Sequence, residues 1–215
     1  MTPQKIYIFL AVALAVSYAL GRFHARYQTS AFQNKGEALV TRAIQSNFAP
    51  PSYHLLNHVT LKLADGTTQI DHVLVSRFGV FVIETKNFNG WIFANAKQAT
   101  WTQVLFHKKF KFQNPIFQNM RHVQAVANSL DFLPPTAIKP LVVFTGDAKF
   151  KTETPSEVFT INTLVEHIKH HTEEIISLNR MQFCVGRLET TRLEISGQTD
   201  IEHVESLRRR HGNKN

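Results

Sequence analysis

The segment 80–86 constrains the fold most, because it opens with four consecutive apolar residues and ends in Glu84-Thr85-Lys86. Val, Phe and Ile favour β-strands, and a strand this apolar is expected to be buried on both faces. Side chains alternate between the two faces of a strand, so Glu84 and Lys86 share one face. The sequence therefore predicts a buried strand that carries two opposite charges where it leaves the sheet.

The preceding strand supplies a third charged residue. Asp71 is the one carboxylate in an apolar run that extends to Val75, and a turn at residues 77–79 separates the two strands. A hairpin around this turn brings Asp71 close to Glu84 and Lys86. The sequence therefore predicts that two carboxylates and a lysine meet at one end of the sheet.

This set of charged residues has two interpretations. Neighbouring carboxylates repel each other, and a hard divalent cation such as Mg²⁺, which takes oxygen ligands, relieves the repulsion. A bound ion can generate a nucleophilic water for phosphoryl chemistry, and Lys86 can position that water or neutralise developing charge. Alternatively, Glu84 and Lys86 form a structural ion pair and Asp71 caps a loop.

Periodicity and turn signals predict an α/β fold, in which a mixed β-sheet is flanked by helices. The expected helices run from Asn34 to the Pro50-Pro51 pair, from Asn114-Pro115 to Leu133, and from an N-cap at Asn162 to Ser177, followed by a basic helical tail ending in Arg208-Arg209-Arg210. The expected strands cover residues 54–63, 68–76, 80–86, 91–93, 100–106, 110–112 and 141–145.

A single hydrophobic helix is expected ahead of this fold, over the uncharged segment Ile6–Leu20. A helix of this length covers about 22 Å, less than the roughly 30 Å hydrocarbon core, but flanking Lys5 and Arg22 can snorkel and the bilayer can thin. We expect an uncleaved membrane anchor, with a cleaved signal peptide as the main alternative. Basic residues are more frequent after the segment, so the C-terminal domain is expected to face the cytoplasm from the inner (cytoplasmic) membrane, with a single pass.

The charge balance predicts an anionic partner. The chain carries 24 Lys and Arg against 16 Asp and Glu, a formal net charge of +8, which fits nucleic acid or an acidic lipid surface. A single cysteine, Cys184, excludes an intramolecular disulfide framework and a Cys-rich zinc module.

Basic and aromatic residues alternate over residues 107–112. Such a segment can follow a nucleic-acid backbone while its rings support the bases, and Arg121 and His122 of the next helix can join the same patch. Alternatively, it is an edge strand that its lysines protect against aggregation. The expected nucleic-acid contacts are Lys108, Lys109, Lys111 and Arg121.

Four sequence elements together resemble the nuclease-related domain (NERD) family. Gln69 to Ser76 and Gly79 to Asn87 are similar to its core, Gly36-Glu37 to its first helix, and Asn114-Pro115-x-x-Gln118 to a later helix opening. The elements occur in the family's order and span residues 34–133. The match of four ordered elements is specific, whereas an Asp…Glu-x-Lys pattern alone is common by chance.

This resemblance implies a restriction-endonuclease-like fold and a metal-dependent nuclease site. Asp71 and Glu84 would bind Mg²⁺ or Mn²⁺ with the Thr85 carbonyl, Lys86 would assist the attacking water, and Glu37 would complete the catalytic set. Three further residues match motif positions and are expected to support the site: Gln69, Asn114 and Gln118.

The resulting hypothesis is a membrane-anchored nuclease that hydrolyses phosphodiester bonds of DNA or RNA, with DNA the expected partner. Its expected domains are an anchor and juxtamembrane segment (1–26), a nuclease-like core (27–150) and a C-terminal helical extension packed on the core (151–215). The alternatives are a non-catalytic module that binds nucleic acid or protein at the membrane, and a structural protein in which the charged set is a buried ion pair.

Overall fold

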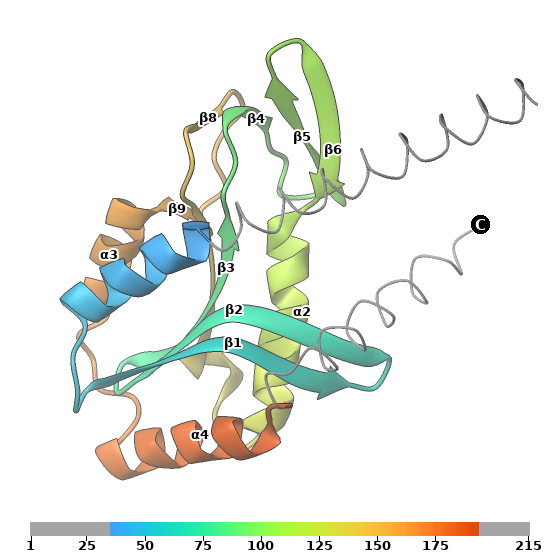
Figure 1. The fold of residues 1–215 in the computed structure, drawn as a ribbon. Helices are drawn as coiled ribbons and strands as arrows, with labels where there is room; N and C mark the ends of the chain where they lie inside the picture. The colour runs from blue at the N-terminus through green and yellow to red at the C-terminus, as the bar shows by residue number, and fades with distance from the viewer. Residues whose placement is uncertain (1–34, 194–215) are drawn as a thin grey trace, which may run out of the picture. The chain divides into compact units, whose positions relative to one another are not determined.

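The computed structural model describes residues 35–193 (Figure 1). The predicted membrane anchor and the predicted basic tail lie outside these residues. Within residues 35–193, none of the helices has the length and apolar character that crossing a bilayer requires.

The centre of the fold is a five-stranded sheet of β1 (Tyr53–Leu63), β2 (Gly66–Ser76), β3 (Gly79–Lys86), β7 (Ile138–Phe144) and β9 (Val158–Thr160), in that order. The sheet is mixed, because the first three strands pair antiparallel whereas β7 pairs parallel with both β3 and β9. Every residue of β3 is buried, which confirms the prediction from its apolar sequence.

The described helices cover residues 35–47, Pro115–Ser129 (α2), Pro135–Ala137 (the 3₁₀ helix η1), Ile161–Lys169 (α3) and Leu178–Thr191 (α4). α2 and α4 bury Val126 and Cys184 against the valines of β2 and β3. The 35–47 helix and α3 bury Ile44 and Leu164 against the opposite face. Helices thus flank the mixed sheet, and the predicted α/β class is confirmed (Figure 1).

A second sheet is formed by β6 (Lys108–Gln113), β5 (Thr100–Leu105), β4 (Gly90–Phe93) and β8 (Ala148–Phe150), in that order. β4 follows β3 along the chain and β8 follows β7, so two strands of this sheet continue from central strands. Its inner face buries Ile92 and Trp101, and the Trp101 ring stacks on Phe144 of β7 with 6.4 Å between centroids.

The hairpin between β2 and β3 has the register that the sequence predicts. Ser76 pairs with Gly79 and His72 with Ile83, so the chain turns at residues 77–78. Asp71 comes immediately before the first of these paired residues on β2.

The C-terminal helices differ from the prediction. Thr160, not Asn162, is the N-cap of α3, because its hydroxyl accepts the amide of Thr163 while the hydroxyl of Thr163 accepts the amide of Thr160. α3 ends at Lys169 rather than near Ser177, and Ser177 is instead the N-cap of a separate helix, α4.

Two shorter features also differ. α2 ends at Ser129, before the predicted Leu133, and the Pro134-Pro135 pair that was expected to stop it begins η1 instead. β8 and β9 were not predicted, because each has only three residues and shows no alternation.

Asn119 ties α2 to the two central parallel strands. Its buried side-chain amide donates to the carbonyl of Val82 on β3 at 3.0 Å and to that of Leu141 on β7 at 2.9 Å. Its own Oδ1 is buried and has no hydrogen-bond partner within the described part of the chain. An unpaired buried acceptor costs free energy, so the two donated bonds must outweigh this cost for the residue to stabilise the fold.

Replacing Asn119 with Ala removes both bonds, and we expect the free energy of unfolding to fall by about 1–3 kcal/mol. Urea unfolding of the full chain measures the change. Asn128→Ala, on the exposed side of the same helix, is the control and is expected to shift stability by less than about 0.5 kcal/mol. Equal stability of the two variants would contradict this role of Asn119.

Candidate active site

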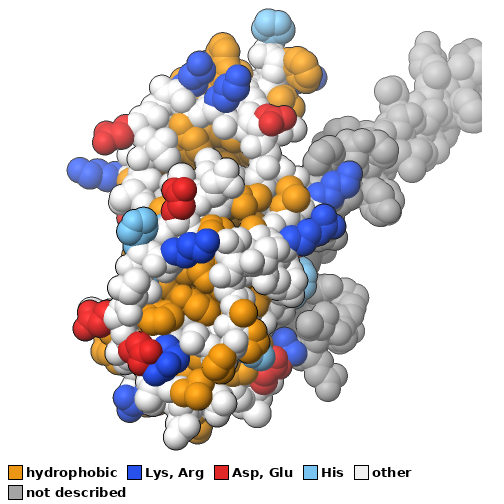
Figure 2. Space-filling view, turned by 90° about the vertical axis from the view of Figure 1, so that its left-hand side faces the viewer, with side chains coloured by type: hydrophobic (Ala, Val, Ile, Leu, Met, Phe, Trp, Pro, Cys, Tyr) orange, Lys and Arg blue, Asp and Glu red, His pale blue; other side chains and the backbone are white. Residues whose placement is uncertain are grey.

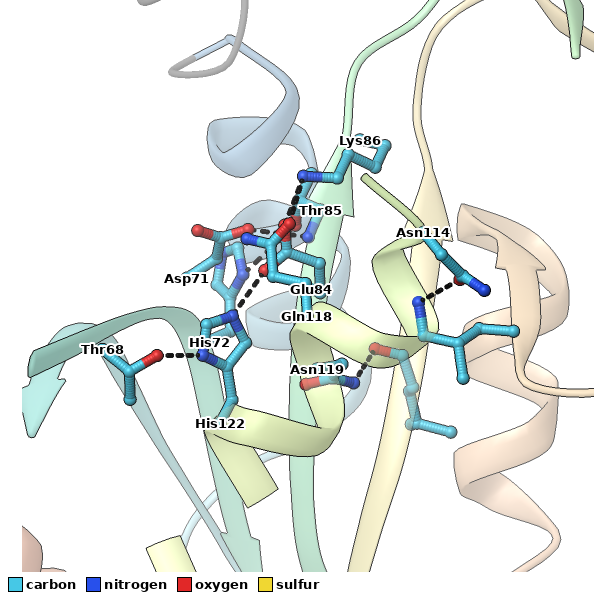
Figure 3. Close-up of polar contacts among 12 residues, drawn as sticks. Thr68, Asp71, His72, Glu84, Thr85, Lys86, Asn114, Gln118, Asn119 and His122 are labelled. Carbon is cyan, nitrogen blue, oxygen red and sulfur yellow. Dashed lines mark hydrogen bonds and ion pairs between the residues drawn. The ribbon is translucent and has the colours of Figure 1, made fainter. Parts of the chain in front are cut away.

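Asp71, Glu84 and Lys86 meet where β2 and β3 separate, as the sequence predicts (Figure 3). The backbone N–H of Thr85 donates to Asp71 Oδ2 at 2.7 Å, which holds this carboxylate against the end of β3. Lys86 Nζ donates to Glu84 Oε1 at 2.5 Å. The two strands therefore position the three side chains without help from a loop.

Glu84 is bound through both of its carboxylate oxygens. Oε1 accepts from Lys86, and Oε2 lies 2.9 Å from Nε2 of His122 on α2. The side chain is 2% exposed, so burial alone would raise its pKa. The charge of Lys86 and the hydrogen bond from His122 outweigh burial and hold the pKa of Glu84 well below its ordinary value. Glu84 is therefore ionised.

Lys86 is the cation of the site. Its Nζ donates to Glu84 and, at 3.1 Å, to Oε1 of Gln118, so Gln118, which was expected to support the site, contacts Lys86 directly. Burial alone would lower the pKa of Lys86, but the neighbouring charge of Glu84 reverses this effect and raises it. Lys86 therefore carries its proton in this arrangement.

The pKa of Asp71 is shifted in the opposite direction to that of Glu84. Burial raises the pKa of Asp71 well above its ordinary value, and the negative charges of Glu84 and Glu37 raise it further. Lys86 and the amide of Thr85 lower it but do not compensate. The site thus brings three carboxyl groups, Glu37, Asp71 and Glu84, close to one lysine.

Glu37 reaches this site from the 35–47 helix. Its carboxylate lies 3.4 Å from Nδ1 of His58, and its pKa is raised, chiefly by burial. The helix approaches β3 closely at Gly36, where a Cβ atom would lie 2.6 Å from Thr145 Oγ1 and 2.8 Å from Asn87 Cβ. Only glycine fits this approach, which explains why Gly36 precedes Glu37.

His72 fastens the same helix to β2. Its Nε2 lies 3.0 Å from the hydroxyl of Thr41 and 3.2 Å from the carbonyl of Glu37. Burial lowers the pKa of His72 to about 4, so the ring is neutral at physiological pH. This contact fixes the part of the helix that carries Glu37.

His122 is a residue of the site that the sequence analysis did not place there. It was considered as an addition to the basic surface patch, but it is 3% exposed and links Glu84 to Thr68, whose hydroxyl lies 2.8 Å from its Nδ1. The available signal was its position four residues after Gln118, which places both side chains on one face of α2. Arg121, on another side of the helix, contacts both carboxylate oxygens of Asp65, at 2.8 and 3.1 Å.

The other predicted residues lie outside this cluster of contacts. Asn114 accepts the amide of Ile116 as the N-cap of α2, and its Nδ2 donates to the carbonyl of Gln98 at 2.8 Å, so it fixes the start of the helix. Gln69 is half-buried on β2, two residues before Asp71. The expected nucleic-acid contacts Lys108, Lys109 and Lys111 are exposed on β6.

The chemistry of the set fits a hard divalent cation. Glu37, Asp71 and Glu84 offer carboxylate oxygens, and burial, followed by the charges of Glu84 and Glu37, raises the pKa of Asp71, so a bound cation would stabilise its charged form. Within residues 35–193, no group of three or more His, Cys, Asp or Glu side chains is already arranged as a metal site. The carboxylates therefore match a divalent cation in their charge and in their oxygen ligands.

Asp71 and Glu84 are expected to affect stability with opposite signs. The raised pKa of Asp71 means that its charge opposes folding at pH 7, so Asp71→Asn should raise the free energy of unfolding, by about 0.5–2 kcal/mol. The lowered pKa of Glu84 means that its charge stabilises the fold at neutral pH, and this contribution is lost as the pH falls below 4.5.

Glu84→Gln should accordingly lower the free energy of unfolding, by about 3 kcal/mol, because it leaves Lys86 buried without its main partner. Urea unfolding of both variants at pH 7 measures the two effects. Destabilisation of similar size in both would contradict the charge assignment.

Comparison with known proteins identifies the family of the chain. The family model of the nuclease-related domain matches residues 33–145, more than half of the chain. The chain is also similar to an uncharacterized protein of Bacillus anthracis, with 34% identity over 186 residues that cover 78% of this chain and 87% of that protein. The match to the family model includes both strands of the carboxylate and lysine set. The chain therefore belongs to the nuclease-related domain (NERD) family.

Proposed function

We propose that this protein is a metal-dependent nuclease that hydrolyses phosphodiester bonds of DNA, with RNA as the alternative substrate. One observation carries the proposal: Asp71, Glu84 and a charged Lys86 meet at one end of the central sheet. Membership of a family described as nuclease-related supports the same reaction class.

Asp71 and Glu84 would hold Mg²⁺ or Mn²⁺ through their carboxylates, with the carbonyl of Thr85 as a further ligand and Glu37 in support. When bound, such an ion polarises a phosphoryl oxygen and lowers the pKa of a water. The excess of carboxylate charge over cationic charge supports this assignment.

The pKa of Lys86 favours one of the two roles considered for it. A charged ammonium donates hydrogen bonds and neutralises negative charge, whereas a group that accepts a proton must be neutral. The pKa of Lys86 is raised, and Glu84 and Gln118 hold its Nζ. Lys86 would therefore stabilise the charge that develops on the phosphate in the transition state.

The remaining contacts have positioning roles. His122 and Thr68 hold Glu84 from the side of α2, and the amide of Thr85 holds Asp71 from β3. A purely structural ion pair accounts for Glu84 and Lys86, but it does not account for Asp71, whose charge is unfavourable beside them. Residues that cost stability in this way are typical of active sites.

We expect Lys86→Ala to lower cleavage by at least about a hundredfold, because it removes a donor to the developing charge. The full chain is incubated with plasmid DNA, single-stranded DNA and RNA in Mg²⁺, Mn²⁺ or EDTA. Lys62→Ala, an exposed lysine on β1, is the matched control and should cleave like the wild type.

Two outcomes would contradict the proposal. One is cleavage that persists in EDTA, and the other is undiminished cleavage by the Lys86→Ala variant. If the folded wild type retains DNA on a gel but gives no product with either ion, the protein is instead a nucleic-acid-binding module.

We propose further that the segment Ile6–Leu20 anchors the domain at the inner membrane, with the nuclease domain in the cytoplasm. The support is the uncharged apolar sequence and the excess of basic residues that follows it. The substrate would then be nucleic acid that comes close to the membrane.

Placing lysines at Leu10 and Leu14 of the full chain should move the protein from the carbonate-washed membrane fraction to the supernatant, because charge in the bilayer core is costly. Leu39→Lys, at an exposed apolar residue of the described helix, should leave the protein in the membrane fraction. Retention of the Leu10→Lys/Leu14→Lys variant, or a mature protein that begins after residue 20, would contradict the anchor.

A further inference from the structure

The solvent face of the four-stranded sheet carries exposed aromatic rings. Trp91 is 49% exposed and Phe93 is 40% exposed, and both point to the face opposite the buried Ile92. The buried face already packs Trp101 and Phe112 into a core, so the outer rings are not needed to hold the sheet. Large exposed rings on a rigid sheet call for an explanation beyond folding.

Lysines flank these rings. The strand register aligns Lys109, Val104, Trp91 and Lys149 directly across the four strands, so one row has a lysine at each end and a tryptophan between them. Lys111 extends the same face on β6, because it lies two residues after Lys109.

The positive charge on this face is not balanced within the sheet. Lys151 follows β8, and its Nζ lies 4.7 Å above the centre of the Trp91 ring. Within the described residues, the four strands contain four lysines and no Asp or Glu. Figure 2 shows Lys or Arg side chains beside hydrophobic ones at the end of the molecule that carries this sheet.

The register also divides the residues that the sequence assigned to nucleic-acid binding. Lys109 and Lys111 lie on the same face as Trp91, whereas Lys108 pairs with Leu105 and lies on the other face. Arg121 contacts Asp65 elsewhere in the molecule. The basic surface is therefore built around Trp91, and it includes the two lysines of the β8 segment that the sequence analysis did not consider.

We propose that this face, made of Trp91, Phe93, Lys109, Lys111, Lys149 and Lys151, binds single-stranded nucleic acid. Unpaired bases present ring faces that stack on Trp and Phe, whereas the bases of a duplex are stacked on each other and shielded. The lysines on both sides match the charge of a phosphate backbone.

The inference rests on the proposed function, since it names the strand class that the nuclease would receive. β4 begins at Gly90, four residues after Lys86, so the strand that carries Trp91 continues directly from the strand that carries the catalytic lysine. Substrate held on the face would thus be bound to the same continuous segment as the site.

The test measures binding in EDTA, where the proposed metal-dependent cleavage cannot occur. A labelled single-stranded oligonucleotide is titrated with the full chain, and the affinity is read from its fluorescence anisotropy. Trp91→Ala should weaken binding roughly tenfold, whereas Trp91→Phe, which keeps an aromatic ring, should bind nearly as the wild type does. The double variant Lys109→Ala/Lys149→Ala should reduce the salt dependence by about 0.7 in slope for each lysine. Lys62→Ala, which removes one exposed lysine from β1, is the control and should leave the affinity nearly unchanged.

Tryptophan fluorescence gives a second readout. The chain has two tryptophans, and Trp101 is 1% exposed, so quenching by the oligonucleotide reports contact with Trp91. Equal affinity for a duplex of the same sequence, absent quenching, or full affinity in Trp91→Ala would each overturn the inference. If the protein gives any of these results but still cleaves nucleic acid in a metal-dependent way, the proposed nuclease function stands and only the binding inference fails. If binding depends on Trp91 and the lysines but no cleavage occurs, only the binding inference stands.

Discussion

Glu84 accepts a hydrogen bond on each carboxylate oxygen, from Lys86 and from His122, and the rest of the site depends on this double contact. It joins the end of β3 to α2 at a side chain that is only 2% exposed, where an ionised carboxylate persists only with such partners. Burial makes the charged form of the neighbouring Asp71 unfavourable, and the charge of Glu84 adds to this effect. The two carboxylates thus differ in charge preference because Glu84 has two donors and Asp71 has one backbone amide.

Some contacts around the site stabilise the fold, whereas the grouping of its carboxylates opposes folding. Asn119 and His122 fix α2 against the central strands, while Gly36 lets the first described helix come close enough to add Glu37. The added carboxylate raises the pKa of Asp71 further. A protein selected for stability alone would not collect three carboxylates around one lysine, whereas a site that receives a cation benefits from the arrangement.

The sequence predicted the part of the site that depends on local pattern. Alternation along two strands and a short turn between them are enough to bring Asp71 to Glu84 and Lys86, because a hairpin fixes its own register. His122 could not be placed in the same way, since its role depends on how α2 is rotated against the sheet. The aromatic and basic face could not be predicted from the sequence either. Lys149 lies beside Trp91 only because β4 pairs parallel with β8, and β8 is a three-residue strand without a recognisable sequence pattern.

We expect the carboxylates of Asp71 and Glu84 to bind one divalent cation. Electron paramagnetic resonance of Mn²⁺ titrated into the full chain tests this binding directly, because free and bound Mn²⁺ give different signals. We predict one bound ion per chain, lost in Asp71→Asn and retained in Asp65→Asn, a matched change at an exposed carboxylate. Absence of bound Mn²⁺ in the wild type, or equal binding by the Asp71→Asn variant, would contradict it.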